Sequence, residues 1–182
     1  FKQVHSRDEH HGLIADLVAD DQLSPSANHT ALLRLPWTDV FTTNYDTLLE
    51  EAAEECGRRY SNVYNPSDLA RARPPRIVKL HGSLPNRFPL IITEEDYRKY
   101  PRKRAPFVAL ARSSLAENAL VLIGFSGDDP NFLSWTGWIR DHLGDSAPPI
   151  YFVTLDLPAP KRTLLEKRRI APIDLSPIVP AN

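Results

Sequence analysis

The chain has 182 residues, of which 42% are hydrophobic and 25% are charged; it is long enough for one well-buried domain and has the composition of a globular rather than a disordered protein. The net charge of −1 at pH 7 argues against a general electrostatic hold on nucleic acid or on an anionic membrane. Cys56 is the only cysteine, which excludes a disulfide framework and a cysteine-ligated zinc site and favours a reducing cytoplasm.

Helical and strand patterns alternate along the sequence, and no apolar run approaches the length needed to span a membrane. In the first half, the predicted elements in chain order are a helix over residues 7–20, a helix from Ser24-Pro25 through Leu35, a strand over 39–43, a helix from Leu48 to about Gly57, a short edge strand over 62–64 and a strand over 76–80. In the second half they are a short strand over 90–92, a helix capped by Thr93 and running to about Glu117, a strand over 119–123, a helix with Phe132, Trp135 and Ile139 in the core, a strand over 150–155 and a helix over 162–169.

Strands separated by helices, with nearly continuous apolar runs, predict an α/β fold of the Rossmann-like, doubly wound class with a parallel sheet. We expect residues 1–182 to form a single domain. The sequence contains no Met, so we also expect it to be a segment of a longer protein.

Two other features have mainly structural interpretations. The basic run YRKYPRKR, residues 97–104, is predicted to be a solvated loop between helices, with a phosphate-binding patch as the alternative. Cys56 lies in a predicted helix and is interpreted as a small, buried or half-buried side chain rather than a nucleophile.

Three predicted strands end in small polar motifs. Thr-Thr-Asn-Tyr-Asp covers residues 42–46, His-Gly-Ser covers 81–83, and Gly-Phe-Ser-Gly-Asp-Asp covers 124–129. In a parallel sheet all strands end at the same edge, and ligands of open α/β folds bind outside that edge. The three motifs are therefore predicted to converge on one site.

The side chains in these motifs restrict the chemistry. Asn44 has both a donor and an acceptor for hydroxyls or water, Asp46 accepts from an amide, and His81 takes up a proton near neutral pH. Gly124 permits close backbone approach, and Ser126 hydrogen-bonds a sugar or a phosphate. Together they suit a dinucleotide whose ribose must be activated. The alternatives are that Asn44 and Asp46 form an ordinary turn and helix cap, and that His81 is a satisfied histidine in a tight turn.

The motifs resemble those of the sirtuin catalytic domain, and most of all those of the sirtuin-like NAD+-hydrolase domains of bacterial antiphage defence proteins. Residues 42–46 resemble the sirtuin Thr-Gln-Asn-Ile-Asp motif, 79–83 resemble the His-Gly motif that carries the general base, and 124–130 resemble the Gly-Thr-Ser nucleotide-binding motif. The stretch 93–97 and the predicted helix with His29 also fit, so the resemblance covers most of residues 24–175.

The resemblance implies roles for individual residues. Asn44 would orient the ribose and a water molecule, His81 would act as general base through a ribose hydroxyl, and Asp46 would hold the nicotinamide end. The residues implied to bind the rest of the dinucleotide are Thr43, Gly124 and Ser126. NAD+ would be the substrate, water the acceptor, and no metal would take part.

Two departures from the sirtuin pattern refine this expectation. Sirtuin deacylases carry a four-cysteine zinc module between the His-Gly and Gly-Thr-Ser motifs, but here residues 82–123 contain no cysteine. This favours NAD+ hydrolysis over deacylation. The family's Gly-Ala-Gly phosphate loop is also absent, and we expect it upstream in the longer protein.

The implied function is antiphage defence by depletion of NAD+ in the cytoplasm. The expected partners are NAD+ itself, further copies of the chain in a homo-oligomer, and other domains or a phage-sensing protein that supply the trigger; no direct nucleic-acid or membrane contact is expected. The alternatives are a non-catalytic module that binds NAD+ or ADP-ribose, and a protein deacylase.

Three further positions have open interpretations. His29 is structural or lies near the site, and Asp156 contacts the adenosine ribose or is a surface residue. The pair His10-His11 has no matching ligands at a suitable spacing, so a metal site is not expected there.

Overall fold

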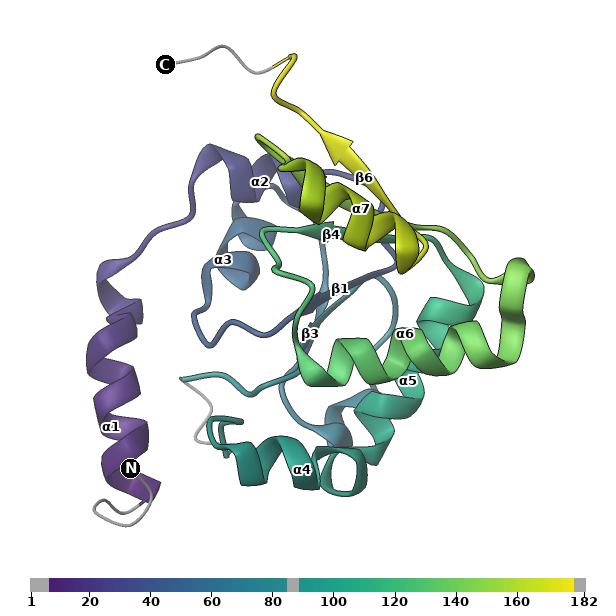
Figure 1. The fold of residues 1–182 in the computed structure, drawn as a ribbon. Coiled ribbons are helices and arrows are strands. Elements are labelled where there is room, and N and C mark those ends of the chain that lie inside the picture. Colours follow the sequence, from purple (N-terminus) through teal and green to yellow (C-terminus); the bar gives the residue numbers. More distant parts are fainter. Residues whose placement is uncertain (1–6, 85–88, 179–182) are drawn as a thin grey trace. The chain divides into compact units, whose positions relative to one another are not determined.

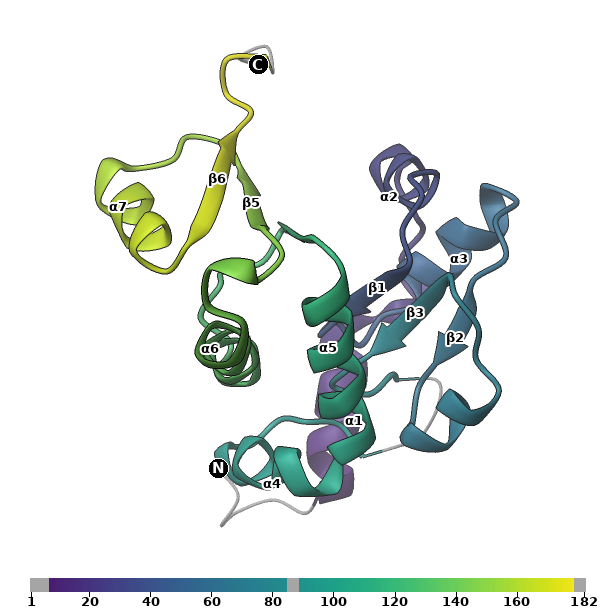
Figure 2. The ribbon, with the colours of Figure 1, turned by 90° about the vertical axis from the view of Figure 1, so that its right-hand side faces the viewer.

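The structure is a computed structural model that describes residues 7–84 and 89–178. The chain divides into two compact units, Phe1–Phe107 and Val108–Asn182, and each contains a three-stranded parallel sheet (Figure 1, Figure 2). The predicted class, an α/β fold of Rossmann-like type built on parallel strands, is confirmed. That residues 1–182 form a single domain stays a prediction.

The first unit begins with helices and then builds its sheet. Its described elements in chain order are α1 (Arg7–Val18), the 3₁₀ helix η1 (Asp20–Gln22), α2 (Ala27–Leu33), β1 (Asp39–Thr42), α3 (Leu48–Glu55), β2 (Ser61–Val63), the 3₁₀ helix η2 (Pro66–Ala70), β3 (Arg76–Lys79) and α4 (Glu94–Lys103). Helix α5 (Ala105–Glu117) begins in the first unit and ends in the second.

The sheet of the first unit has the order β1-β3-β2, and the three strands lie side by side in Figure 2. Asp39 pairs with Arg76 at the start of β1 and β3, and Thr42 pairs with Lys79 at their end. The backbone N–H of Leu80 donates to Thr42 O at 2.9 Å and continues the ladder by one residue. The chain therefore leaves β1 and β3 at the same edge.

Helices α2 and α3 form the core of this unit with the sheet. Leu33, Ala52, Ala53 and Ile77 make a buried cluster, and the half-buried Cys56 packs against it, as predicted. Complete burial of a side chain such as Leu33 or Ile77 contributes about 1.5–3 kcal/mol.

The second unit repeats the strand–helix pattern. Its elements after α5 are β4 (Leu120–Ile123), α6 (Pro130–Leu143), the 3₁₀ helix η3 (Gly144–Ser146), β5 (Ile150–Thr154), α7 (Ala159–Lys167) and β6 (Ile170–Asp174), with sheet order β4-β5-β6. A buried cluster of Leu122, Phe132, Phe152, Leu165 and Ile170 lies between this sheet and its helices. The predicted core positions Phe132, Trp135 and Ile139 of α6 are buried.

Several predicted boundaries were wrong. Helix α2 begins at Ala27 rather than beside Pro25, because Ser26 is its N-cap. The helix predicted from Thr93 to Glu117 is two helices that break at Arg104, since Pro106 lacks the N–H that a continuous helix would use.

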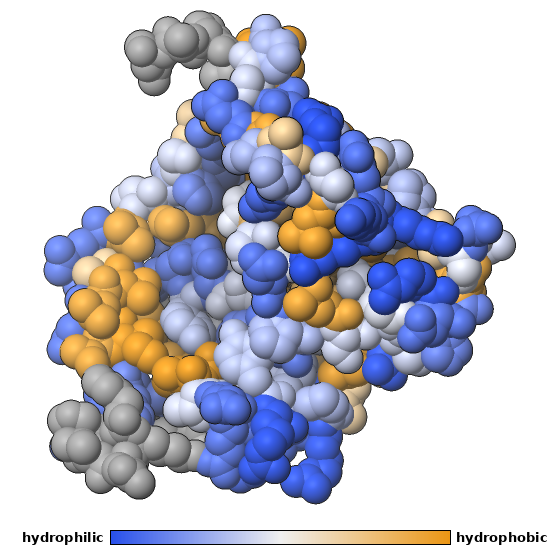
Figure 3. Space-filling view, viewed as in Figure 1, coloured by the Kyte–Doolittle hydropathy of each residue, from blue (hydrophilic) through white to orange (hydrophobic). Residues whose placement is uncertain are grey.

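The basic run at residues 97–104 is not a loop. Residues 97–103 form the body and last turn of α4, and Arg104 is its C-cap. Basic side chains in the last turn are favoured by the helix dipole, and acidic residues occupy the first turn. Figure 3 shows the outer surface of α4 as hydrophilic, whereas apolar colour follows α1, where Leu13 and Leu17 are exposed.

Two strand predictions also differ from the structure. Residues 90–92 form no strand, although Leu90 and Ile91 are buried; the backbone link from Ile91 N–H to His81 O, 3.0 Å, is not part of a ladder. Strand β6 was missed because it contains Pro172, which is tolerated here at the edge of a sheet.

Within the described residues, none of the helices combines the length and the apolar character that a membrane crossing requires.

Candidate active site

Two of the three predicted motifs come together in the first unit. Asn44 and Asp46 follow β1, His81 follows β3, and the pairing of Thr42 with Lys79 brings both segments to the same edge of the sheet. This is the edge at which α/β folds bind their ligands.

The turn after β1 is held by residues other than Asn44. Asp46 Oδ1 accepts from Leu48 N–H at 3.2 Å, so this carboxylate satisfies a donor at the start of α3. Asp20 accepts from Thr47 N–H at 2.7 Å and from Thr47 Oγ1 at 3.0 Å. Asn44 is exposed, and within the described part of the chain its carboxamide makes no hydrogen bond. The turn interpretation thus applies to Asp46, which precedes the N-cap Thr47, but not to the carboxamide of Asn44.

Tyr45 connects this turn to the segment after His81. Its hydroxyl donates to Ile91 O at 2.6 Å, and its own backbone O accepts from Leu84 N–H at 3.1 Å. Burial raises the pKa of the Tyr45 phenol, and the negative charge of Asp96 raises it further. The phenol therefore stays protonated and remains a donor near neutral pH.

Lys79 makes a second connection from β3. Its side chain is 1% exposed, and Nζ donates to the backbone O of Asp46. The same Nζ lies 3.6 Å from Glu50 Oε1, on α3. Burial raises the pKa of Glu50, and the nearby Lys79 lowers it in part.

Helix α4 determines the surroundings of His81. The histidine is 4% exposed, and the rings of Tyr97 and Tyr100 meet its ring edge-on, with centroids 5.2 and 6.1 Å away. The Tyr100 hydroxyl donates to Leu80 O at 3.1 Å, next to the histidine in sequence. Edge-to-face ring pairs contribute about 0.5–1.5 kcal/mol each beyond burial, so the imidazole is held in one orientation.

Helix α4 is itself anchored at both ends. At its start, Asp96 N–H donates to Thr93 Oγ1 at 3.3 Å and Thr93 N–H donates to Asp96 Oδ2 at 3.0 Å, which confirms the predicted cap. At its end, the buried Arg104 donates from Nη2 to Pro89 O at 2.8 Å. These links fix the helix over the turn that carries His81.

Gly82 is required by the backbone of that turn. Its φ is +94°, which side chains disfavour, and an added Cβ would lie 3.0 Å from Leu90 Cδ2. The His-Gly pair therefore reflects local geometry as well as chemistry.

The third motif follows β4 in the second unit. Gly124 has φ +62° and lies in open surroundings, and the exposed Ser126 accepts from Asp128 N–H at 3.3 Å. Asp129 caps α6 by accepting from the N–H groups of Asn131 and Phe132, at 2.9 and 3.0 Å. Gly124 and Ser126 thus occupy an accessible loop at the carboxyl end of β4.

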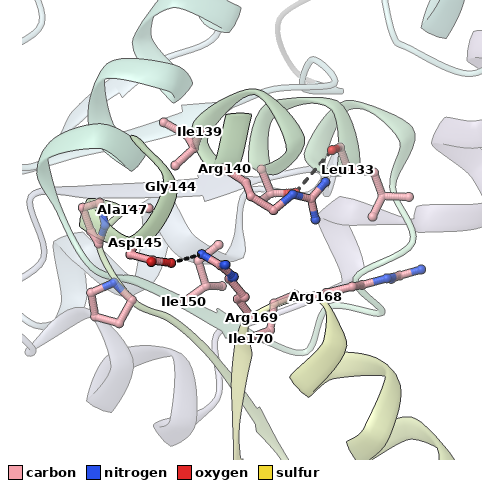
Figure 4. A pocket seen from close by; sticks show the side chains of 13 residues that line it. Leu133, Ile139, Arg140, Gly144, Asp145, Ala147, Ile150, Arg168, Arg169 and Ile170 are labelled. Carbon is pink, nitrogen blue, oxygen red and sulfur yellow. Dashed lines mark hydrogen bonds and ion pairs between the residues drawn. The ribbon is translucent and has the colours of Figure 1, made fainter. Parts of the chain in front are cut away.

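A cavity of about 480 Å³ lies at the other edge of this second sheet, where β5 and β6 begin (Figure 4). Arg140, Arg168 and Arg169 line it, and Arg169 pairs with Asp145 at 2.6 Å. The arginines lie at the C-terminal ends of α6 and α7, where the helix dipole favours cations. Because the cavity lies at the starts of the strands and α/β folds bind ligands at the strand ends, we do not assign it to the dinucleotide.

Other predicted positions have structural roles or stay open. His29 Nδ1 accepts from Ser26 N–H at 3.0 Å in the capping box of α2, which confirms the structural interpretation of this histidine. Asp156 has φ +52° and is exposed after β5. Among the residues that the structure describes, no group of three or more His, Cys, Asp or Glu side chains is arranged to hold a metal.

Sequence reasoning missed the residues that support the site. Lys79 belongs to a motif and Tyr97 to a helix start, but neither was predicted to touch the site segments. The spacing of Tyr97 and Tyr100, which places both on one helix face, was a usable signal. The inward direction of Lys79 was not, because a charged residue is rarely buried.

Comparison with known proteins gives a consistent result. The NAD(+) hydrolase ThsA of Acinetobacter baumannii (strain 532279) is 35% identical over 124 residues, covering 65% of this chain and 25% of that protein. The NAD(+) hydrolase ThsA of Enterococcus faecium is 30% identical over 149 residues, covering 78% and 31%. Defense-associated sirtuin 2 of Bacillus subtilis is 27% identical over 161 residues, covering 85% and 16%.

This chain thus spans less than a third of the length of these relatives. The SIR2-like domain family matches residues 38–173, from the start of β1 into β6. That span is well over half of the chain and contains all three motifs. The chain therefore belongs to the SIR2-like domain family.

Proposed function

We propose that this chain is the catalytic domain of an NAD+ hydrolase that splits NAD+ into nicotinamide and ADP-ribose. The observation that carries the proposal is the register of β1 and β3, which brings Asn44, Asp46 and His81 to one edge of a parallel sheet. Membership of the SIR2-like family and the similarity to proteins named NAD(+) hydrolase support it.

In the proposed reaction the bond between the nicotinamide nitrogen and the ribose carbon breaks, and its electron pair leaves with neutral nicotinamide. Water forms the new bond to that carbon and gives up a proton. His81 takes up a proton through a ribose hydroxyl, Asn44 orients the ribose and the water, and Asp46 holds the nicotinamide end. Thr43, Gly124 and Ser126 bind the rest of NAD+.

The local structure supports these roles for His81 and Asn44. The tyrosine rings of α4 restrict the imidazole, which a general base needs because proton transfer depends on its position. Asn44 is exposed with a carboxamide not used for capping, so its donor and its acceptor remain available for a ligand.

The segment after His81 favours hydrolysis over deacylation. The described residues between Gly82 and Gly124 form α4, α5 and β4, and α4 packs directly on His81. This segment lacks cysteine, so it provides no counterpart of the zinc module beside which sirtuin deacylases bind acyl-lysine.

The biological role we propose is antiphage defence by NAD+ depletion, in line with the name of the Bacillus subtilis relative. This role requires access to the cytoplasmic NAD+ pool. It also requires control by other domains or by a phage-sensing partner in the longer protein. We expect the active form to be a homo-oligomer, which light scattering of the full-length protein would measure.

Product analysis tests the proposed activity. The activated full-length protein that contains this chain is incubated with NAD+, alone and with an acyl-lysine peptide, and products are separated by chromatography. We expect equal amounts of nicotinamide and ADP-ribose without peptide. NAD+ binding without nicotinamide release would indicate a silent binding module, and O-acyl-ADP-ribose formed only with peptide would indicate a deacylase.

A further inference from the structure

A buried lysine connects the two segments of the candidate site. Lys79 lies on β3, two residues before His81, and its ammonium donates to the backbone O of Asp46 in the turn after β1. Thr42, the last residue of β1, is its register partner. One side chain therefore bridges the strand that carries the proposed base to the turn that carries Asn44.

Core packing does not explain a lysine at this position. The side chain is 1% exposed, and an aliphatic residue would fill the same space without the cost of removing a charge from water. That cost is offset by the Asp46 carbonyl and by Glu50, 3.6 Å from Nζ. Glu50 is itself buried, and within the described residues neither of its carboxylate oxygens has a hydrogen-bond partner.

The bonded atom also suggests a role beyond an ion pair. Asp46 O is a backbone acceptor in the irregular turn before α3, where no strand ladder fixes the chain. Thr47 is held by Asp20 and Tyr45 by Ile91 and Leu84, so Lys79 supplies the link between them. A turn held at consecutive residues presents Asn44 in a defined position.

We propose that Lys79 is a positioning residue for NAD+ cleavage: it holds the turn of Asn44 and Asp46 at a fixed distance from His81, with Glu50 as its counter-charge. This inference rests on the proposed hydrolase function. Lys79 itself does not touch the substrate. Its effect comes from placement, because a shift of about 1 Å in a reacting group lowers a rate by about a hundredfold.

The test uses a double variant, so that no buried charge is left without its partner. Lys79→Met with Glu50→Gln in the full-length protein removes both charges and keeps the shape of the core. We expect kcat for nicotinamide release to fall at least about tenfold while the Kd for NAD+ changes less than about threefold. The melting temperature is measured on the same samples.

The matched control is an ion pair that joins β3 to β1 at the starts of the two strands. Arg76 and Asp39 lie at the starts of β3 and β1, whereas the site segments follow the ends of these strands. Arg76 Nε lies 2.6 Å from Asp39 Oδ1. Arg76→Met with Asp39→Asn removes this pair far from the site segments. We expect it to lower the melting temperature while kcat stays near the wild-type value.

The outcomes separate the two claims. If the wild type releases nicotinamide and the Lys79 double variant releases it equally fast, the positioning role is wrong; if kcat falls equally in the Arg76 control, the effect is general loss of stability and the role is also wrong. If the wild type releases none, the hydrolase proposal fails and this inference fails with it. If the double variant does not fold, two single variants replace it. Lys79→Arg keeps a cationic donor and should retain a higher kcat than Lys79→Gln. Equal losses of kcat would overturn the proposal.

Discussion

Asn44 and Asp46 use their side chains differently although they stand two residues apart in one turn. The carboxylate of Asp46 satisfies the start of α3, whereas the carboxamide of Asn44 is exposed and takes no part in capping. Both residue types are common at helix starts, so the sequence alone leaves the two roles open. Only the hydrogen bonds of the turn show that the Asp46 carboxylate also holds the start of α3, whereas the Asn44 carboxamide does not.

This difference predicts that the two variants differ in stability. Asn44→Ala should change the free energy of unfolding by less than about 0.5 kcal/mol, because no hydrogen bond is lost, but should abolish most nicotinamide release. Asp46→Ala should cost about 1 kcal/mol through the lost hydrogen bond from Leu48 N–H. Chemical denaturation and activity assays measure both. If Asn44→Ala destabilises the chain as much as Asp46→Ala, Asn44 is a capping residue.

Gly82 gives a second prediction at this scale. Gly82→Ala should destabilise the chain by about 2 kcal/mol or more, because the new methyl combines a disfavoured φ with a contact 3.0 Å from Leu90 Cδ2. Gly57→Ala is the control: φ is +69°, but nothing lies within 4 Å of its Cβ, so about 1 kcal/mol is expected. Equal losses in denaturant titrations would show that the Leu90 contact has no effect.

At the scale of elements, α4 is the main support of the proposed base. It contributes two rings to the surroundings of His81, and hydrogen bonds to Leu80, Pro89 and Thr93 hold it in place. A change that loosens α4 should therefore slow nicotinamide release as well as lower the free energy of unfolding.

Two matched capping boxes test this. Asp96 accepts from Thr93 N–H at the start of α4, and Asp68 accepts from Asn65 N–H at the start of η2, each at 3.0 Å. Asp96→Ala and Asp68→Ala should each cost about 1 kcal/mol of stability. Only Asp96→Ala should also slow nicotinamide release, and equal activity in the two variants would contradict a supporting role for α4.

The contact between α3 and β3 predicts a pH dependence. Burial raises the pKa of Glu50 above its ordinary 4.5, and Lys79 offsets this in part. A raised pKa means that the folded chain binds the proton more tightly, so this contribution to stability is full below the unfolded pKa and is lost as the pH rises through the folded one. The free energy of unfolding of the wild type relative to Glu50→Gln should therefore fall as the pH rises above about 4.5, the ordinary pKa of the carboxyl group. Denaturation at several pH values measures it, and a rise would show that the pKa is lowered instead.

At the scale of the whole molecule, strand–helix alternation was sufficient to predict the parallel α/β class. The apolar, β-rich runs at residues 119–123 and 150–155 contain β4 and β5, with Leu122 and Phe152 buried, and such runs are a clear strand signal. Strand β6 was not predicted because it contains Pro172. Proline argues against a strand unless the strand is known to lie at the edge of its sheet. Residues 90–92 were predicted as a strand because they are apolar, but Leu90 and Ile91 pack in the core without pairing to another strand.

The candidate site was also predictable only in part, because the sequence shows where strands end but not which way side chains point. The motifs mark strand ends, so parallel pairing alone brings Asn44, Asp46 and His81 to one edge. The contacts of Lys79 and Tyr100 depend on which way side chains point in three dimensions, and no short sequence pattern encodes that.

The most direct test of the account measures nicotinamide release and NAD+ affinity together, in the activated full-length protein and its His81→Ala variant. We predict that the variant releases nicotinamide about a hundredfold or more slowly, the usual scale for the loss of a general base, while its NAD+ affinity changes much less. A neutral imidazole contributes little to holding the dinucleotide, but it removes a proton as positive charge develops on the ribose. Equal rates in wild type and variant would contradict the assignment of His81 as the base.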